Sequence, residues 1–417
     1  MLKVALLFPG QGSQYAGMAR DLIHAFPLAR EAFEEASESV GFDVGKLCSE
    51  QDMSTLTRTE FAQPAILTMS VATFRVLEQE TKLIPNCMAG HSLGEYSALS
   101  CSGALSLGDA VKLVHKRGQF MADCALRSEG AMMAIIDCAP ETVYEVCNEI
   151  NARHGVVVTS NLNSSKETII SGIKSAVIKA GNDLEQKGAK TVLLKVGGAF
   201  HSPLMHEASE FLANYIEENI RFSPMKYPVF SNVTAAFHDP VQLKSSLINQ
   251  VINPIRWFET IQVMREEGIT HTVEVGPKQT LTKLIQSDFP DMTRFSTENV
   301  NKIHKIIDVW GRGETSRQIM TPTQFINKCL LFAVSTKNRN EKYALVEKEV
   351  ADLYRELRHI QDEVLLNDDS EHALIRAHQC IKSILKHKNT SSEEYKSRIN
   401  ELSAQLVAKN LIEEEMV

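Results

Sequence analysis

The sequence lacks the features that would place the protein in a membrane or on nucleic acid. No apolar run approaches the ~20 residues that a membrane-spanning helix needs. Lys and Arg total 44 against 52 Asp and Glu, which gives a formal net charge of −8. Because phosphate recognition needs a concentrated basic surface, we expect neither a membrane nor a nucleic-acid partner.

Paired cysteines are also missing. The eight cysteines are scattered, with no Cys-x-x-Cys pair and no histidine at ligand spacing. This pattern favours reduced thiols over disulfides or a zinc site. The first residues, MLKVALLFPGQGSQ, are too short and end in the wrong residues for a secretory signal. We therefore expect a cytoplasmic protein.

The glycine-rich segment FPGQGSQY, residues 8–15, lacks the spacing of a nucleotide-binding loop. After Gly10 and Gly12 the next glycine is Gly17, and no Gly-Lys-Ser/Thr follows. The segment comes after a predicted strand over residues 4–8 and exposes successive backbone N–H groups. Such a turn can serve an anion other than phosphate.

The chain is long enough, at 417 residues, for two or three domains. Short apolar strands alternate with helical patterns at the start, as in α/β proteins. A β-α-β-β-α-β order then indicates an inserted ferredoxin-like subdomain, and apolar residues at spacings of three and four indicate a helical C-terminal extension. The predicted boundaries are 1–128 and 198–300 for the α/β catalytic subdomain, 129–197 for the insertion, 301–320 for a linker and 321–417 for the helices.

The strongest motif is AGHSLGEYSAL, which contains Gly-x-Ser-x-Gly as Gly90, Ser92 and Gly94. On a nucleophile elbow the serine occupies a sharp turn between a strand and a helix, where flanking glycines avoid steric clashes. The preceding LIPNCMA can supply the strand, and a helix can begin at Glu95. The sequence therefore predicts that Ser92 is a nucleophile.

A serine hydroxyl needs a general base, and in an α/β-hydrolase-type chain the histidine follows the serine. His201, in GAFHSPLM, lies in a loop where the chain re-enters the main layer. A lone histidine is more often structural, so other histidines stay open as alternatives. The downstream candidates are His154, His201, His206, His238 and His271.

Arg117 lies on the apolar stripe of the predicted helix DAVKLVHKRGQFMADCAL. A buried guanidinium must be paired. Its partner is either an internal carboxylate, in a structural ion pair, or the carboxylate of a substrate, which the planar guanidinium can hold through two parallel hydrogen bonds.

Taken together, these motifs resemble malonyl-CoA:acyl carrier protein transacylases over about residues 1–290. More particularly, the chain resembles the free-standing, trans-acting acyltransferases that serve polyketide synthases lacking their own acyltransferase domains. The resemblance implies an α/β-hydrolase-like subdomain with a ferredoxin-like insertion. It rests on the segments FPGQGSQ, TEFAQPAI, GHSLGEYSAL, KRGQ, SNLNS, GAFHS, SNVT and EVGPKQTLT.

The resemblance also implies roles for individual residues. Ser92 matches the acylated nucleophile, His201 matches its general base, and the backbone carbonyl of Gln250 matches the group that orients the histidine. The backbone N–H groups of Gln11 and Leu93 match an oxyanion hole. The FPGQGSQ turn is thereby expected to bind the oxyanion of a tetrahedral intermediate.

Substrate-binding positions follow in the same way. Arg117 matches the residue that holds the acyl carboxylate, and Phe200 matches a bulky residue that favours malonyl over methylmalonyl groups. Gln63 and Asn161 match other polar residues of the site.

The resemblance implies transfer of a malonyl group from malonyl-CoA to the phosphopantetheine thiol of an acyl carrier protein, for polyketide or fatty acid biosynthesis, without a metal or bound cofactor. One alternative is an acyl hydrolase that clears carrier proteins. Such enzymes tend to lose the arginine, so Arg117 favours transfer. The other alternative is a scaffold that docks on a polyketide synthase through its C-terminal helices, although we expect the apolar seams of those helices to pack within the chain.

Overall fold

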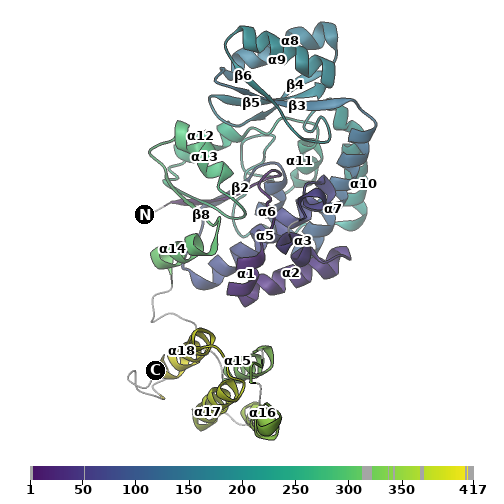
Figure 1. The fold of residues 1–417 in the computed structure, drawn as a ribbon. Coiled ribbons are helices and arrows are strands. Elements are labelled where there is room, and N and C mark those ends of the chain that lie inside the picture. Colours follow the sequence, from purple (N-terminus) through teal and green to yellow (C-terminus); the bar gives the residue numbers. More distant parts are fainter. Residues whose placement is uncertain are drawn as a thin grey trace. The chain divides into compact units, whose positions relative to one another are not determined.

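The computed structural model describes residues 3–50, 52–311, 322–336, 338–340, 343–366, 371–408 and 411. The chain divides into two compact units, Met1–Gly311 and Arg312–Val417, which are described separately below (Figure 1). Within the described ranges, no helix has the length and apolar character needed to cross a bilayer.

A parallel sheet lies at the centre of the first unit. Its strand order is β2 (Cys87–Gly90), β1 (Val4–Phe8), β7 (His271–Glu274) and β8 (Thr293–Ser296). All residues of β1 are buried, as expected for a strand covered by helices on both faces. Phe8 pairs with Gly90, so the FPGQGSQ turn and the GHSLG turn leave neighbouring strands at the same edge of the sheet.

Helices pack on both sides of this sheet (Figure 1). The long helices α5 (Thr59–Glu80) and α7 (Leu107–Leu126) contact each other closely. A Cβ atom on Gly118 would lie 2.6 Å from Cα of Glu60, so only glycine permits this approach. Further helices around this sheet are α1 (Arg20–Ala25), α2 (Pro27–Val40), α3 (Val44–Ser49), α4 (Met53–Leu56), α6 (Leu93–Cys101), η1 (Pro203–Met205), α10 (His206–Asn219), α11 (Leu243–Gln250), α12 (Trp257–Glu266) and α13 (Thr280–Asp288).

The inserted subdomain has the predicted β-α-β-β-α-β order. Its elements are β3 (Gly130–Ile136), α8 (Pro140–His154), β4 (Val157–Leu162), β5 (Glu167–Ile173), α9 (Lys174–Gln186) and β6 (Lys190–Leu193). The strands form an antiparallel sheet in the order β4-β5-β3-β6, and both helices lie on one of its faces (Figure 1). The predicted α/β-hydrolase-like fold with a ferredoxin-like insertion is confirmed.

The insertion is joined to the larger subdomain near β4. The backbone N–H of Leu162 donates to the carbonyl of Ile255, and that of Ile255 donates to Ser160. The small sheet is thereby held next to the segment that follows Gln250.

The predicted linker is wrong over residues 301–310, because they form helix α14 (Val300–Trp310). The Asn299 side chain caps this helix by accepting from the Lys302 N–H. Ile303 and Ile306 are buried in the hydrophobic core of the first unit. The unit continues to Gly311, eleven residues beyond the predicted boundary. The remaining linker residues, 312–320, lie outside the described residues.

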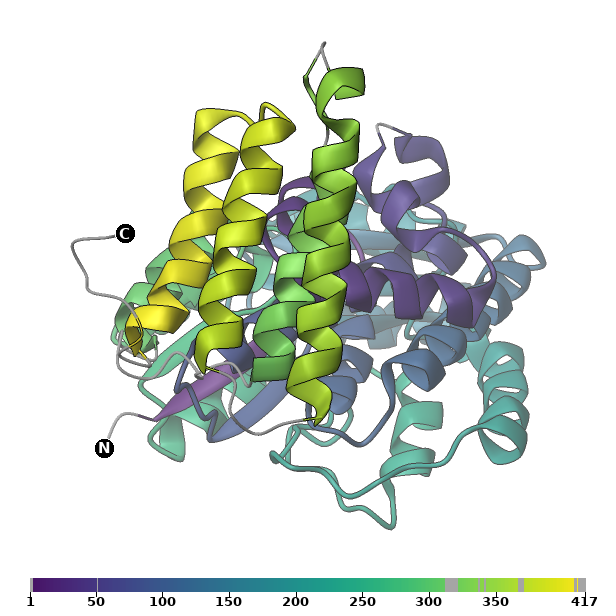
Figure 2. The same cartoon turned by 90° about the horizontal axis from the view of Figure 1, so that it is seen from below.

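The described part of the second unit contains helices and no strand, as predicted. Helices α15 (Pro322–Ser335), α16 (Tyr343–Leu366), α17 (Glu371–His387) and α18 (Ser392–Ala408) lie side by side (Figure 2). The Ser391 hydroxyl accepts from the Glu394 N–H at the start of α18. The apolar seams of these helices face one another in a core of their own, which includes Leu357, Ile360, Ile381, Leu385, Ile399, Leu402 and Leu406.

Candidate active site

Ser92 lies in a strained turn between β2 and α6. Its φ of 52° and ψ of −106° are unusual for a residue with a side chain. The turn requires both flanking glycines, because a Cβ atom on Gly90 would lie 1.8 Å from the carbonyl carbon of Gly94. A Cβ atom on Gly94 would lie 2.0 Å from the carbonyl oxygen of Phe8. These contacts explain the Gly-x-Ser-x-Gly spacing.

The side chain of Asn232 forms hydrogen bonds with the backbone of this turn. Its Oδ1 accepts from the Ser92 N–H at 2.8 Å, and its Nδ2 donates to the carbonyl of Gly90 at 2.7 Å. Sequence reasoning quoted the SNVT motif that contains Asn232 but assigned the residue no role. Its two hydrogen bonds show that it stabilises the strained backbone around Ser92.

His201 is the candidate histidine whose side chain contacts Ser92. The distance from His201 Nε2 to Ser92 Oγ is 2.7 Å, and its Nδ1 lies 2.8 Å from the backbone carbonyl of Gln250. A carbonyl oxygen only accepts, so Nδ1 carries the proton and Nε2 presents a lone pair to the serine. The Gln250 carbonyl is available because Gln250 is the last residue of α11.

Burial keeps His201 neutral. The side chain lies in the interior, and burial, followed by the positive charge of Arg117, lowers the pKa of His201 to about 3. A neutral imidazole can accept the serine proton at pH 7. The other candidates do not contact Ser92 through any hydrogen bond in the described part of the chain, and His238 is instead paired with Glu95.

Arg117 lies beside the nucleophile and is only 2% exposed. Its Nη1 donates to Gln63 Oε1 at 2.7 Å, and its Nη2 donates to Gln250 Oε1 at 2.9 Å and to Ser92 Oγ at 3.3 Å. Its carbon Cζ lies 5.2 Å from the centre of the Tyr96 ring. Burial lowers the pKa of the guanidinium, an effect that Tyr96 and Glu95 oppose.

The groups that accept hydrogen bonds from Arg117 are all neutral. Among the residues that the structure describes, no carboxylate forms an ion pair with Arg117, and its Nε has no hydrogen-bond partner. The structural ion pair that sequence reasoning left open is therefore not formed. Arg117 is thus a buried cation beside the Ser92 hydroxyl whose hydrogen-bond acceptors in the described structure are all neutral.

The loop after β1 reaches the same site. A Cβ atom on Gly10 would lie 2.4 Å from the carbonyl oxygen of His91, so the loop packs tightly against the turn. Thr59 links the two regions, because its hydroxyl donates to Gln11 Oε1 at 2.9 Å and accepts from Gln63 Nε2 at 2.8 Å. Thr59 is a further polar residue of the site that sequence reasoning missed.

Two predicted residues lie outside this hydrogen-bond network. Phe200 precedes His201 and is buried in the hydrophobic core. Asn161 accepts from the Ser160 hydroxyl at 2.9 Å. It is Asn163, two residues further on, whose Oδ1 lies 2.8 Å from His91 Nε2, next to the nucleophile.

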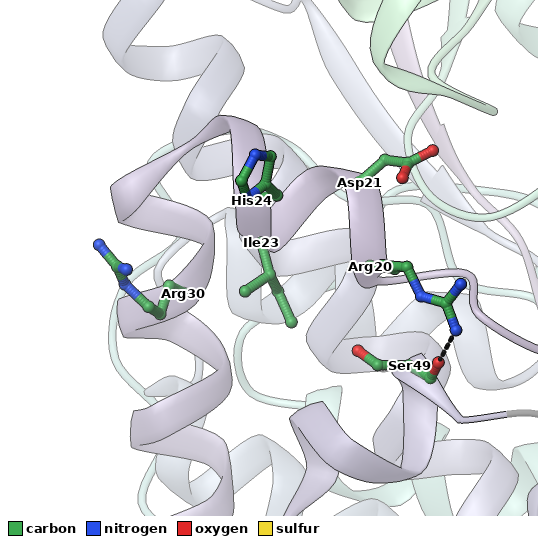
Figure 3. Close-up of a pocket in the computed structure, with 6 residues that line it drawn as sticks. All are labelled: Arg20, Asp21, Ile23, His24, Arg30 and Ser49. Atoms are coloured by element: carbon green, nitrogen blue, oxygen red, sulfur yellow. Dashed lines mark hydrogen bonds between the residues drawn. The ribbon is translucent and has the colours of Figure 1, made fainter. Parts of the chain in front are cut away.

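A separate surface pocket of about 530 Å³ lies at helices α1 to α3 (Figure 3). It is lined by Arg20, Asp21, Ile23, His24, Arg30 and Ser49. Its charged side chains are exposed to solvent, and Arg20 donates to the Ser49 carbonyl at 2.9 Å. None of the residues around Ser92 lines this pocket, so it is not part of the site.

The fold and this site are those of an acyltransferase. A family model described as an acyl transferase domain matches residues 5–321. A malonyl CoA-acyl carrier protein transacylase from Bacillus subtilis is 34% identical over 365 residues, which cover 87% of this chain and 90% of the relative. The chain belongs to the malonyl CoA-acyl carrier protein transacylase family.

Solved structures of transacylases also match this chain. A malonyl CoA-acyl carrier protein transacylase from Coxiella burnetii matches with a TM-score of 0.72 and 38% identity, over 75% of this chain and 98% of its own. A malonyl-transacylase solved in complex with a type II PKS acyl-carrier protein matches with a TM-score of 0.71 and 35% identity, over 74% of this chain and 99% of its own. The 365 residues matched in the Bacillus relative exceed the length of the first unit, so that similarity extends into the helical unit.

Proposed function

We propose that the protein transfers a malonyl group from malonyl-CoA, through an ester on Ser92, to the phosphopantetheine thiol of an acyl carrier protein. The observation that carries this proposal is the buried guanidinium of Arg117, which lies 3.3 Å from Ser92 Oγ and has only neutral acceptors. A malonyl thioester can supply the carboxylate partner that Arg117 lacks. The carbon of that carboxylate lies two bonds from the carbon that the serine attacks.

In the first half-reaction, Ser92 Oγ attacks the thioester carbonyl while His201 Nε2 accepts the hydroxyl proton. The tetrahedral intermediate collapses, the carbon–sulfur bond breaks, and the CoA sulfur leaves with the proton returned from His201. The 2.7 Å contact between Ser92 Oγ and His201 Nε2 supports this transfer of the proton. A malonyl ester of Ser92 remains.

In the second half-reaction, the carrier-protein thiol attacks the ester carbonyl. His201 accepts the thiol proton and then gives it to Ser92 Oγ as the ester bond breaks. The products are the malonyl thioester of the carrier protein and free Ser92. His201 acts in both halves, and the steps require neither a metal nor a bound cofactor.

The oxyanion is stabilised by the backbone N–H groups of Gln11 and Leu93. Leu93 is the first residue of α6, where helical N–H groups have no partner within the helix and the helix dipole favours negative charge. The loop containing Gln11 packs against the same turn at Gly10. Removing one such donor typically costs about 3 kcal/mol of transition-state stabilisation.

Substrate choice rests on Arg117 and Phe200. The guanidinium selects an acyl group that ends in a carboxylate, and Gln63, bonded to it at 2.7 Å, holds it in place. Phe200 leaves little room for a branch at the α-carbon and so favours malonyl over methylmalonyl groups. Asn161, a buried residue of the insertion, contributes a polar group to the site.

We assign the reaction to polyketide biosynthesis in the cytoplasm, with the helical unit as a contact for the synthase. The relative solved with a polyketide carrier protein supports the pathway. All eight cysteines are free thiols, as expected in a reducing compartment. The apolar side chains of the helical unit pack against one another in its own core. Any contact with a synthase therefore uses the outer surface of this unit.

The test is intact-mass analysis of the protein after incubation with malonyl-CoA, followed by addition of phosphopantetheinylated carrier protein. We expect a malonyl adduct on the wild type that moves to the carrier. Loss of the adduct to water, with stripping of acyl groups from the carrier, would identify a hydrolase instead. A wild type that acquires no adduct would support the scaffold alternative.

A further inference from the structure

A buried carboxylate lies one helical turn beyond the nucleophile. The side chain of Glu95 is fully buried, and its Oε1 is 2.7 Å from Nε2 of His238, which is 1% exposed. This contact has the distance of an ion pair but not the geometry of a hydrogen bond. Its other oxygen accepts from Gln250 Nε2 at 2.7 Å and from the Asn232 N–H at 3.1 Å. Neither Glu95 nor His238 contacts Ser92 Oγ or His201 through a hydrogen bond that the structure describes.

Glu95, together with the Ser92 carbonyl, fixes which way the Gln250 side-chain amide points. The Gln250 Nε2 donates to Glu95 Oε2 and to the Ser92 carbonyl at 2.9 Å. Its Oε1 consequently faces Arg117 and accepts from Nη2 at 2.9 Å. A carboxylate only accepts hydrogen bonds and a guanidinium only donates them. A reversed amide would therefore set oxygen against oxygen on one side and N–H against N–H on the other.

We propose that Glu95, in ion-pair contact with His238, is a positioning residue that orients Gln250 and thereby places Arg117 for the acyl carboxylate. This inference rests on the proposed malonyl transfer. It extends the site by a chain of contacts that runs from His238 through Glu95 and Gln250 to Arg117. The same glutamine thus serves two groups, since its backbone carbonyl orients His201 and its side chain orients Arg117.

The decisive variant is Glu95→Gln, which keeps the size of the side chain but replaces one acceptor oxygen with a donor. Gln250 can then turn its amide over, and Arg117 loses the acceptor that holds Nη2. We expect the KM for malonyl-CoA to rise about tenfold, since a hydrogen bond to a charged group is lost. Acylation of Ser92 by p-nitrophenyl acetate, which has no carboxylate, should change less than about twofold.

Matched controls separate positioning from general damage to α6. Ser97→Ala changes the same helix at a buried hydroxyl that has no hydrogen-bond partner in the described structure, and it should leave both reactions unchanged. His238→Gln can keep a donor facing Glu95 and should preserve the KM for malonyl-CoA. His238→Leu removes that donor and should raise this KM in the same direction as Glu95→Gln.

The outcomes are distinguishable. If Glu95→Gln slows p-nitrophenyl acetate and malonyl-CoA equally, or changes neither, the positioning role is wrong. If Glu95→Gln does not fold, the two His238 variants decide, and equal KM values for them overturn the proposal. If wild type reacts with p-nitrophenyl acetate but not with malonyl-CoA, the proposed transferase function fails, and this inference fails with it.

Discussion

Each unit of the protein contains a buried histidine next to a serine hydroxyl, but we propose a catalytic role for only one of these pairs. His201 Nε2 lies 2.7 Å from Ser92 Oγ in the first unit, and His378 Nε2 lies 3.1 Å from Ser403 Oγ in the second. Burial lowers the pKa of both histidines, to about 3 for His201 and about 4 for His378. Both are therefore neutral at pH 7.

The surroundings of the two pairs differ. Ser92 and His201 both have positive φ values, 52° and 57°, and the second ring nitrogen of His201 is held by the Gln250 carbonyl. His378 and Ser403 lie on regular helices, α17 and α18, within the apolar core. Backbone strain, an oriented imidazole and the adjacent cation Arg117 distinguish the Ser92–His201 pair, and they are the features from which we infer that it is reactive.

The largest expected difference between the pairs comes from removing each serine hydroxyl. Ser92→Ala should abolish the malonyl adduct and lower transfer by about 10⁴-fold or more, because the nucleophile is lost. Ser403→Ala should leave transfer within about twofold and lower stability by only about 1 kcal/mol. Intact mass, transfer assays and urea unfolding measure these effects. A malonyl adduct on the Ser92→Ala variant would place the nucleophile elsewhere.

Removing the cation should have the next largest effect. Arg117→Ala leaves the malonyl carboxylate in a buried site without a partner, so we expect kcat/KM for malonyl-CoA to fall by about a hundredfold or more. Reaction with p-nitrophenyl acetate should fall far less. Equal losses with both reagents would mean that Arg117 supports the structure and does not bind substrate.

The pH dependence should shift in the same variant. His201 must be neutral to act as a base, and its pKa of about 3 is lowered first by burial and then by Arg117. Removing the positive charge should raise this pKa toward its ordinary value, so activity should be lost at a higher pH as the solution is acidified. The measurement is the pH profile of p-nitrophenyl acetate acylation. Superimposable acid limbs for wild type and Arg117→Ala would contradict this electrostatic coupling.

A core variant tests whether the second unit is needed for the chemistry. Leu402 is fully buried in the helical core, so Leu402→Ala should lower the stability of that unit by about 2–5 kcal/mol. Transfer to free carrier protein should remain within about twofold of wild type. Denaturation followed by circular dichroism, alongside the transfer assay, tests this. A parallel loss of activity would show that the helices support the catalytic unit.

The smallest effect is expected at the surface pocket. Arg30 is exposed to solvent there (Figure 3), so its charge is hydrated and needs no bound anion. Arg30→Ala should change malonyl transfer by less than about twofold. A loss comparable to that of Arg117→Ala would mean that the pocket takes part in substrate or carrier binding.

The sequence carried the information for the elements with strong local signals. The glycines around Ser92, the β-α-β-β-α-β order and the apolar seams of the C-terminal helices all predicted what the structure contains. Helix α14 was missed because the predicted catalytic subdomain ended at residue 300, where this helix begins.

The contacts between distant segments could not be read from the sequence. Glu95 and His238 are 143 positions apart in the numbering, and nothing in either segment indicates their pairing. Thr59 and Asn232 likewise acquire their roles only where helices and turns meet. Arg117 could be assigned to an apolar helix face, but its lack of a carboxylate partner depends on the packing of α5, α7 and α11.

The most direct test of the claim that Arg117 binds the acyl carboxylate is a competition between two acyl donors. Wild type and Arg117→Ala are each mixed with equal concentrations of malonyl-CoA and acetyl-CoA, and the adducts on Ser92 are counted by intact mass. We predict that malonyl dominates on the wild type and that the preference is lost or reversed on the variant. The same malonyl-to-acetyl ratio on both proteins would contradict the claim that the unpaired guanidinium binds the acyl carboxylate.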